Sequence, residues 1–424
     1  MDNAIKRFRY FVLSYISIKN QHHYKNKYYL LSCVIEKDIT PRIFLDISDV
    51  YKSDSGTGIQ RVIKNICDYL IKNTPEGYEI CPIYLHHGRF YHAKKFLSRW
   101  YNIKFNNKSE FLKFSGKDLF IGLTLQGNLS RRTDFMNIFV NTNTKIYFLV
   151  YDLIPIHFAH YCHDCVAGWF PNWLHAISKF DGIIADSRSA ADDYREWKKA
   201  NIPDSGKPFL IDWFHLGADL EKGLGTTGIP ADSAPVFEAM KARPSLLEVS
   251  TVEPRKGHKQ TLAAFEQLWA KGVEANFVIV GKPGWKMDDF FKRVEQHPEF
   301  GRRLFWLKGI SDEYLNAVYE AASGVIMPSE AEGFGLAVIE GAHHGKPLIL
   351  RDIPVFREIA GDNATYFSGL EPKPLAECLE LWLEDFKRGS VIPSTGIKPL
   401  TWAESAQMLL QRLGLATAEN PSKD

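Results

Sequence analysis

Short apolar runs alternate with amphipathic segments along most of the chain, beginning at Pro41. This alternation is typical of parallel β-sheets whose strands are joined by crossover helices. The pattern occurs as two successive series, so we expect two α/β domains. The first series predicts strands over residues 42–47, 79–85, 118–123, 145–150, 182–185 and 208–213, with helices over 59–71 and 169–179.

A segment rich in Gly, Thr, Pro and Ala follows the first series over 217–235 and has little hydrophobic periodicity. Such a composition predicts an interdomain linker. The second series predicts strands over 245–249, 276–280, 304–307, 324–327 and 347–350, with helices over 259–270, 312–322 and 335–344. A short amphipathic segment over 402–413 precedes a polar tail.

These patterns predict two doubly wound, Rossmann-like domains that face each other across a cleft. Ligands bind such folds beyond the carboxyl ends of the parallel strands, so reactive residues should lie in strand-to-helix loops. We assign residues 1–40 to an N-terminal extension, 41–219 to the first domain, 220–240 to the linker, 241–400 to the second domain and 401–424 to a closing helix and tail.

The composition limits the classes of partner. Hydrophobic residues make up 45% of the 424 positions and charged residues 24%, which are values of ordinary globular proteins. A formal net charge of +2 is too small for a protein that binds a nucleic acid backbone. Cys162 and Cys165 form a CxxC beside several histidines, but no second ligand pair stands at a finger-like spacing, so we expect no zinc site.

The N-terminal extension interleaves basic and aromatic residues up to residue 29. Its apolar stretch, 10–18, is far shorter than the ~20 residues of a membrane-spanning helix, and no cleavage site follows it. We expect a cytoplasmic protein. Peripheral contact with an anionic membrane surface and an ordinary solvated extension are equal alternatives for this segment.

The most informative segment is 328–340, between a predicted buried strand and a predicted helix. Gly333 and Gly335 allow the backbone to approach a ligand at the start of the helix, where free N–H groups favour phosphate. Glu340 follows Gly335 by five residues, about 7.5 Å along a helix axis, so its carboxylate could bind a ribose diol. Glu332, within the loop, is placed for a sugar.

Glu332 and Glu340 reproduce the E-x7-E signature of family 4 glycosyltransferases, together with its Gly-Phe-Gly insert. Segments 250–257, 309–315 and 401–404 are also similar to that family, and the resemblance covers essentially all of 240–413. It implies the GT-B fold and transfer of a sugar from a nucleotide-diphosphate donor with retention at the anomeric carbon. It also implies that Lys256, with Arg255 beside it, binds the donor diphosphate.

The first domain resembles the family more loosely. Gly56 and Gly58 lie in a loop that looks like the family's glycine loop facing the donor phosphates. Where relatives often have a histidine after a central strand, this chain has Asp152, with His157 nearby. The resemblance thus implies catalytic roles for Glu332, Lys256, Arg255 and Asp152, a donor site of Gly56, Gly58, Lys256, Phe334, Gly335, Leu336 and Glu340, and an acceptor side with Asp152 and His157.

No two aspartates stand one residue apart, so the D-x-D metal site of many other sugar transferases is missing. Basic side chains and a helix dipole would then neutralise the leaving diphosphate, without a metal or another cofactor. The loop over 251–256 resembles that of bacterial mannosyl- and rhamnosyltransferases of O-antigen or capsule synthesis. GDP-mannose is therefore the expected donor, and a glycan or lipid-linked glycan the expected acceptor.

Two other functions stay open and a third is excluded. A Rossmann dehydrogenase is set aside because no G-x-G-x-x-G follows a strand with an acid about twenty residues on. A nucleotide-sugar epimerase of the same architecture would release a free donor and need no acceptor. A non-catalytic scaffold of a polysaccharide assembly complex would have no need for Glu332, Glu340 and Lys256 together.

Overall fold

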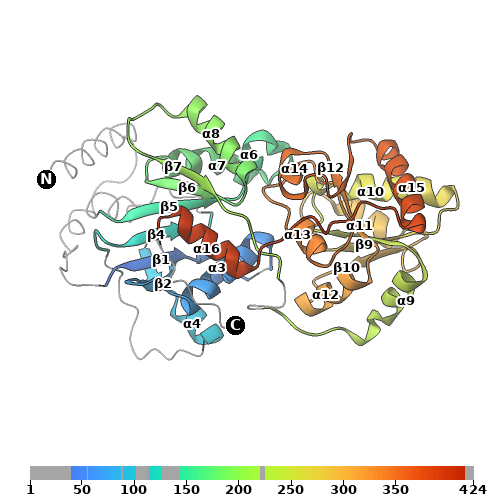
Figure 1. Ribbon diagram of the computed structural model, residues 1–424, viewed down its shortest axis with the longest axis horizontal. Helices are drawn as coiled ribbons and strands as arrows, with labels where there is room; N and C mark the ends of the chain where they lie inside the picture. The colour runs from blue at the N-terminus through green and yellow to red at the C-terminus, as the bar shows by residue number, and fades with distance from the viewer. Residues whose placement is uncertain are drawn as a thin grey trace.

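The computed structural model describes residues 40–54, 56–86, 89–101, 112, 114–125, 143–219 and 225–415. Within these ranges the chain forms two α/β domains side by side, each with a central sheet between helices (Figure 1). The two doubly wound domains predicted from the sequence are thereby confirmed. The basic extension, on which the membrane hypothesis depends, lies outside the described residues.

The N-terminal domain is built on a seven-stranded sheet with the order β3-β2-β1-β4-β5-β6-β7. Neighbouring strands are parallel except for β3, which forms an antiparallel edge with β2. Strands β4 and β6 are buried at every position, as expected for a sheet covered on both faces. The strands are β1 (Arg42–Asp46), β2 (Glu79–His86), β3 (Arg89–His92), β4 (Leu119–Gly122), β5 (Lys145–Val150), β6 (Gly182–Ala185) and β7 (Leu210–Trp213).

Polar caps begin the two helices of this domain that reach the cleft. Thr57 and Gln60 form a capping box, in which Gln60 N donates to Thr57 Oγ1 at 3.3 Å. Ser187 caps a later helix by accepting from Ala190 N at 3.0 Å. The helices are α2 (Ser48–Lys52), α3 (Gly58–Lys72), α4 (Lys94–Tyr101), α6 (Ile154–His157), the 3-10 turn η2 (Ala159–Tyr161), α7 (Asp164–Ile177) and α8 (Arg188–Asn201).

The C-terminal domain has a six-stranded parallel sheet with the order β10-β9-β8-β11-β12-β13. This is the strand order of dinucleotide-binding folds, and the direction of winding reverses between β8 and β11. The loops that follow those two strands therefore line the ligand-binding crevice. The strands are β8 (Ser245–Val249), β9 (Asn276–Val280), β10 (Leu304–Leu307), β11 (Gly324–Met327), β12 (Leu348–Arg351) and β13 (Thr365–Phe367).

One helix of this domain begins inside the range expected to be linker. Helix α9 (Ala234–Ala242) packs its Phe237 ring 5.7 Å from that of Tyr314, and Met240 is buried. It is short and weakly amphipathic, which explains why periodicity did not predict it. The other helical segments are η3 (Ala231–Ser233), η4 (Pro254–Lys256), α10 (His258–Ala270), α11 (Asp288–Glu295), α12 (Asp312–Ala321), α13 (Leu336–His343), α14 (Pro354–Ala360), α15 (Pro372–Arg388) and α16 (Trp402–Arg412).

The last helix, α16, returns from the C-terminal domain to pack on α3 (Figure 1). Trp402 and Leu409 are buried in the same core as the inner side of β1 and α3. Trp402 N donates to Asp219 Oδ1 at 2.6 Å, and a Cβ at Gly217 would lie only 2.5 Å from Trp402 N. The two connections between the domains are therefore packed directly against each other.

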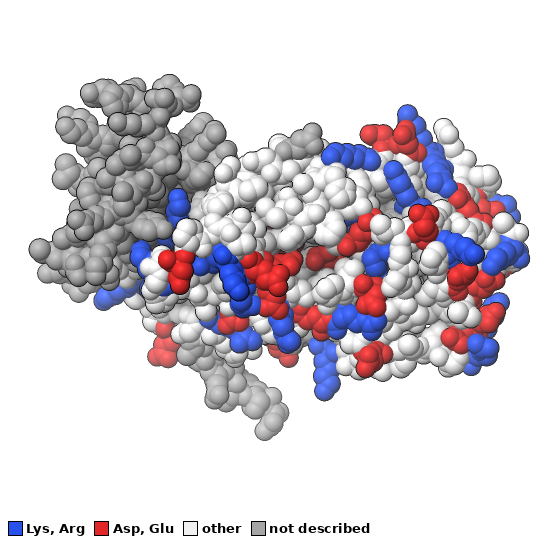
Figure 2. All heavy atoms as spheres, turned by 90° about the horizontal axis from the view of Figure 1, so that it is seen from above, with Lys and Arg blue, Asp and Glu red and all other residues white. Residues whose placement is uncertain are grey.

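The surface mixes charges of both signs over the C-terminal domain, whereas a broad area in the middle of the face shown in Figure 2 carries none. That face is the one on which Figure 1 shows α6 and α7. Among the residues that the structure describes, no helix is long and apolar enough to cross a bilayer.

Candidate active site in the interdomain cleft

The Gly-Phe-Gly loop between β11 and α13 is pressed against both domains. Gly335 has φ +100°, and a Cβ there would lie 2.7 Å from the Phe356 ring. A Cβ at Gly333 would lie 1.9 Å from Tyr151 O at the end of β5, in the other domain. Ser187 Oγ also donates to Gly333 O at 2.7 Å. Any side chain at Gly333 would therefore push the domains apart, and a residue other than glycine at 335 would strain the start of α13.

Glu332 is held by the two basic residues of the loop after β8. Lys256 Nζ lies 2.6 Å from Glu332 Oε1, and Arg255 Nη1 lies 3.1 Å from Oε2. Burial by itself would raise the pKa of Glu332, but the cations Lys256 and Arg255 outweigh it and lower that pKa to about 2. The carboxylate is therefore ionised at neutral pH, and it fixes both cations beside the start of α13.

The loop after β8 that carries Arg255 and Lys256, here called the basic loop, lies close to the Gly-Phe-Gly loop. Gly257, with φ +85°, ends η4, and a Cβ there would lie 2.6 Å from Pro328 O. Arg255 Nη1 donates to Ala331 O at 2.7 Å, and Glu330 N donates to Arg255 O at 2.8 Å. These contacts join the two loops on either side of the point where the sheet reverses its winding.

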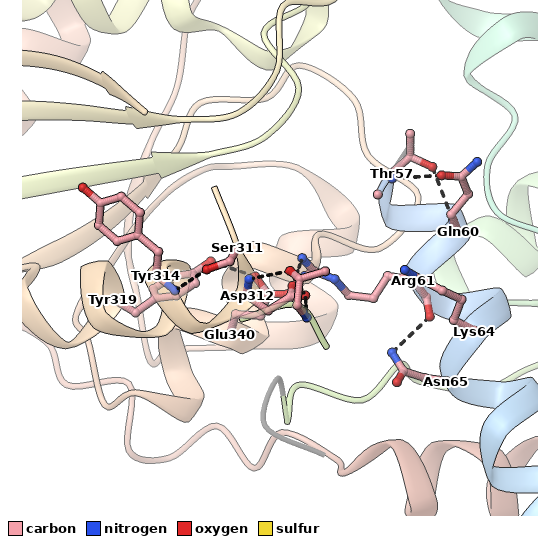
Figure 3. Close-up of polar contacts among 12 residues, drawn as sticks. Thr57, Gln60, Arg61, Lys64, Asn65, Ser311, Asp312, Tyr314, Tyr319 and Glu340 are labelled. Atoms are coloured by element: carbon pink, nitrogen blue, oxygen red, sulfur yellow. Dashed lines mark hydrogen bonds and ion pairs between the residues drawn. The ribbon is translucent and has the colours of Figure 1, made fainter. Parts of the chain in front are cut away.

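Glu340 is also engaged, by a residue from the opposite domain (Figure 3). The carboxylate is buried, and its Oε1 accepts from Arg61 Nη1 of α3. Its Oε2 accepts from Tyr319 OH at 2.8 Å. Arg61 Nη2 in turn lies 3.4 Å from Asp312 Oδ1 at the start of α12. The carboxylate predicted to bind a ribose thus ties the two domains together.

The glycine loop before α3 faces the C-terminal domain across the cleft. Gly56 has φ +63°, and the nearest atom to a Cβ there would be Lys282 Nζ at 3.8 Å. Gly58 begins α3, where a Cβ would lie 3.4 Å from Leu336 Cδ1 of α13. The starts of α3 and α13, which both follow glycines, therefore point toward each other.

The two acceptor candidates lie in different surroundings. Asp152 follows β5, and its Oδ1 accepts from Ile154 N at 3.0 Å. Burial raises its pKa, although Arg255 opposes the shift. His157 is about half exposed, with Nε2 3.9 Å from Asp193 Oδ2 on α8.

A cavity of about 490 Å³ lies between the domains. Arg61, Lys282 and Asp312 also line an adjoining cavity of about 370 Å³. The structure brings every predicted site residue except His157 to the wall of the larger cavity: Gly56, Gly58, Asp152, Arg255, Lys256, Glu332, Phe334, Gly335, Leu336 and Glu340.

The sequence did not single out four other residues at this site. Arg61 and Tyr319 contact Glu340, while Asp186 and Trp285 line the larger cavity. Asp186 is fully buried beside Asp152, and burial followed by the Asp152 charge raises its pKa well above the usual value. Arg61 had one available signal, since it lies one turn after the glycine loop on a predicted helix. The other three carry no local motif.

Metal-ligating residues do not gather in the described part of the chain. Cys162 is buried and Cys165 is exposed, and these two thiols form no metal-ligating group with the described histidines near them.

Comparison with protein families matches residues 234–392 to Glycosyl transferases group 1. Over 385 residues the chain is 38% identical to the serotype-specific mannosyltransferase WbdA of Escherichia coli, covering 89% of this chain and 47% of that protein. Over 139 residues it is 30% identical to the O-antigen chain mannosyltransferase B of E. coli, covering 31% of this chain and 35% of that protein. The chain spans about half the length of the WbdA relatives it matches.

Solved structures give a consistent result for the fold. Anabaena Alr3699/HepE, crystallised with UDP and glucose, superposes with a TM-score of 0.62 at 17% identity, covering 89% of this chain and 100% of that chain. Sucrose-phosphate synthase of Thermosynechococcus elongatus gives a TM-score of 0.59 at 15% identity, covering 88% and 98%. Identities this low establish the fold alone, which is the GT-B fold predicted from the resemblance.

Proposed function

Because residues 234–392 form a glycosyl transferase group 1 domain, we propose that the chain is a retaining, metal-independent mannosyltransferase. It moves mannose from GDP-mannose to a glycan or lipid-linked glycan acceptor in the synthesis of a bacterial surface polysaccharide. The similarity to two E. coli mannosyltransferases, one of them named for the O-antigen chain, supports the choice of sugar and pathway.

One observation carries the proposal: a single cavity between the domains presents Lys256, Arg255 and Glu332 together with the Arg61–Glu340 pair. The cations and the start of α13 form a site for a diphosphate. Glu340 then offers a carboxylate to the ribose of the same nucleotide. This distribution of charge suits a nucleotide-diphosphate sugar lying along α13 with its sugar toward Glu332.

The chemistry follows from where charge develops. As the bond from the anomeric carbon to the phosphate oxygen breaks, negative charge grows on the diphosphate, and Lys256 and Arg255 are already in place to stabilise it. Because Glu332 already holds both cations in place, they need not reorient during the reaction. The acceptor hydroxyl attacks from the face that the phosphate leaves, the phosphate takes its proton, and no protein nucleophile is needed.

Isothermal titration with GDP and with UDP, followed by transfer assays with GDP-mannose in excess EDTA, tests the proposal. We expect tighter binding of GDP, undiminished transfer in EDTA, and a product whose anomeric proton NMR signal shows retention. Tighter binding of UDP contradicts the donor, and activity that is lost in EDTA and restored by Mg²⁺ contradicts metal independence. A free epimerised nucleotide sugar would identify an epimerase, and the absence of any nucleotide binding would identify a scaffold.

A further inference from the structure

The loop after β9 holds Trp285 in a fixed position beside the cavity. A Cβ at Gly281 would lie 1.7 Å from Ser250 O, and one at Gly284 would lie 2.8 Å from Val252 O, so both positions require glycine. Lys286, with φ +56°, is the one non-glycine residue with a positive φ in the described part of the chain. Backbone strain of this kind persists where surrounding contacts enforce it, and it is concentrated at functional sites.

Two side chains of this loop cross the cleft to the segment around η2. Trp285 Nε1 donates to Tyr161 O at 2.6 Å, so the polar edge of the indole is satisfied by the other domain. Lys286 Nζ donates to Cys162 O at 2.8 Å. The Trp285 ring remains partly exposed, lines the larger cavity and lies 5.2 Å from the His163 ring.

These contacts place Trp285 near Glu332. Tyr161 OH donates to Glu330 Oε2 at 2.6 Å, two residues before Glu332. Cys162, the next residue after Tyr161, packs with Ile154 and Ala331. Ile154 lies two residues after Asp152, and Ala331 directly precedes Glu332. The indole lines the same cavity as Asp152 and Glu332, and the segment that it contacts packs against the loops of both.

The segment that Trp285 contacts across the cleft carries almost no charge of its own. Residues 153–177, which include η2 and α7, contain neither lysine nor arginine, and Asp164 is their single acid. Figure 2 shows the uncharged area on the face that carries α6 and α7. A neutral ligand with apolar C–H faces and hydroxyl groups fits this surface, because the segment itself offers an anionic ligand no lysine or arginine.

We propose that Trp285 is the platform on which the acceptor sugar binds: a neutral pyranose stacks on the exposed indole face and turns its reacting hydroxyl toward Asp152 and the donor diphosphate. This assignment rests on the proposed transferase function. Anchoring of Nε1 by Tyr161 O keeps the ring from rotating away, so the face is preorganised for the sugar.

Kinetics of Trp285→Ala, Trp285→Phe and Lys286→Ala, with an α-linked mannotriose as acceptor, test the platform. We expect Trp285→Ala to raise the KM for the trisaccharide about tenfold, equivalent to about 1.4 kcal/mol, and to raise the KM for GDP-mannose much less. Trp285→Phe keeps an aromatic face and should recover most of the loss. Lys286→Ala removes the neighbouring contact across the cleft but leaves the ring, so its acceptor KM should stay near that of the wild type.

Saturation-transfer NMR of mannotriose in the presence of GDP measures the same contact without turnover. Saturation of the ring protons in the wild type and its loss in Trp285→Ala support the platform, even if GDP-mannose proves to be the wrong donor and no transfer occurs. An unchanged acceptor KM in Trp285→Ala, an equal loss in Lys286→Ala, or no saturation in the wild type overturns it.

Discussion

Lys256 is the residue that we propose stabilises the leaving diphosphate. Its ammonium group contacts the buried Glu332 carboxylate at 2.6 Å, so it is fixed before the donor arrives. We expect Lys256→Ala to lower kcat by a factor of roughly 10² to 10³, the effect of removing one preorganised donor to a developing anion. The measurement is kcat at saturating GDP-mannose, with circular dichroism to confirm the fold.

The matched control for that variant is Lys271→Ala. Lys271 pairs with Glu380 on the surface of the C-terminal domain, far from the cavity residues. Exposed pairs contribute little to stability, so this variant should keep the wild-type kcat. A folded Lys256→Ala enzyme that is as active as Lys271→Ala would mean that the diphosphate binds elsewhere.

Glu340 is expected to act on donor binding without affecting the chemical step. Its carboxylate would bind a ribose, which does not change during transfer, so Glu340→Gln should raise the KM for the donor and leave kcat nearly unchanged. The amide also weakens the contacts with Arg61 and Tyr319. Initial rates over a wide range of GDP-mannose separate the two constants, and a fall in kcat alone would contradict a ribose-binding role.

The part of the site that the sequence predicted is the part encoded in short motifs. Glu332, Gly335 and Glu340 are close in sequence, and their spacing carries a physical meaning on a helix. Arg61 matters because it contacts a carboxylate 279 positions away, across the cleft. Trp285 likewise contacts Tyr161 across the cleft, and no local spacing in the sequence records such a contact.

Among the secondary-structure elements, buried parallel strands were the best predicted. The bounds of β8, β9, β10 and β11 agree with those read from the sequence, because such strands appear as continuous apolar runs between turn residues. The edge strands β3 and β13 were not predicted, because they have only four and three residues. Helix α8 was not predicted either, because its buried residues, Ala190, Ala191, Tyr194 and Trp197, are few among charged ones. Helix α16 was predicted as an element, but its return to α3 depends on packing.

A carboxylate on α14 caps α8 of the other domain, and this contact should depend on pH. Glu358 accepts from the backbone N–H groups of Arg188 and Ser189 at 2.7 and 2.8 Å, and from His215 Nε2 at 2.8 Å. Burial opposes ionisation, but these hydrogen bonds outweigh it and lower the pKa of Glu358 from 4.5 to about 2. Because the pKa of Glu358 is lower in the folded protein, its carboxylate stabilises the fold at pH values above 4.5. This stabilisation is lost as pH falls from 4.5 toward 2.

Glu358→Gln should therefore lower the midpoint of thermal unfolding at neutral pH, because the amide is a weaker partner for the start of α8. The difference from the wild type should shrink at about pH 3.5, where part of the wild-type contribution is already lost. Thermal unfolding followed by circular dichroism at both pH values measures this. A difference that stays constant with pH would show that the charge of Glu358 does not hold the domains together.

At the scale of the whole molecule, several contacts between the two domains close the cleft, and one of them involves a residue that we propose binds the donor. Gly333 lies against Tyr151, Glu358 caps α8, and Arg61 reaches Glu340, while the two interdomain connections are packed together at Gly217 and Trp402. Among these contacts, the Arg61–Glu340 pair is the one that engages a carboxylate predicted to bind the nucleotide. We therefore expect Arg61 to couple closure of the domains to occupancy of the proposed ribose site.

Arg61→Met tests that coupling, because the methionine keeps the aliphatic part of the side chain and removes the charge that pairs with Glu340 and Asp312. Without nucleotide, we expect small-angle X-ray scattering to give a larger radius of gyration than for the wild type, as the domains separate around the packed connections. Addition of GDP should return the value toward that of the wild type, because the nucleotide bridges the basic loop after β8 and the glycine loop before α3. Arg195→Met provides the control, since Arg195 pairs with Asp192 within α8 and makes no contact across the cleft through that pair. If Arg61→Met and Arg195→Met scatter alike without nucleotide, the other contacts across the cleft suffice to hold it closed, and the Arg61–Glu340 pair does not control closure.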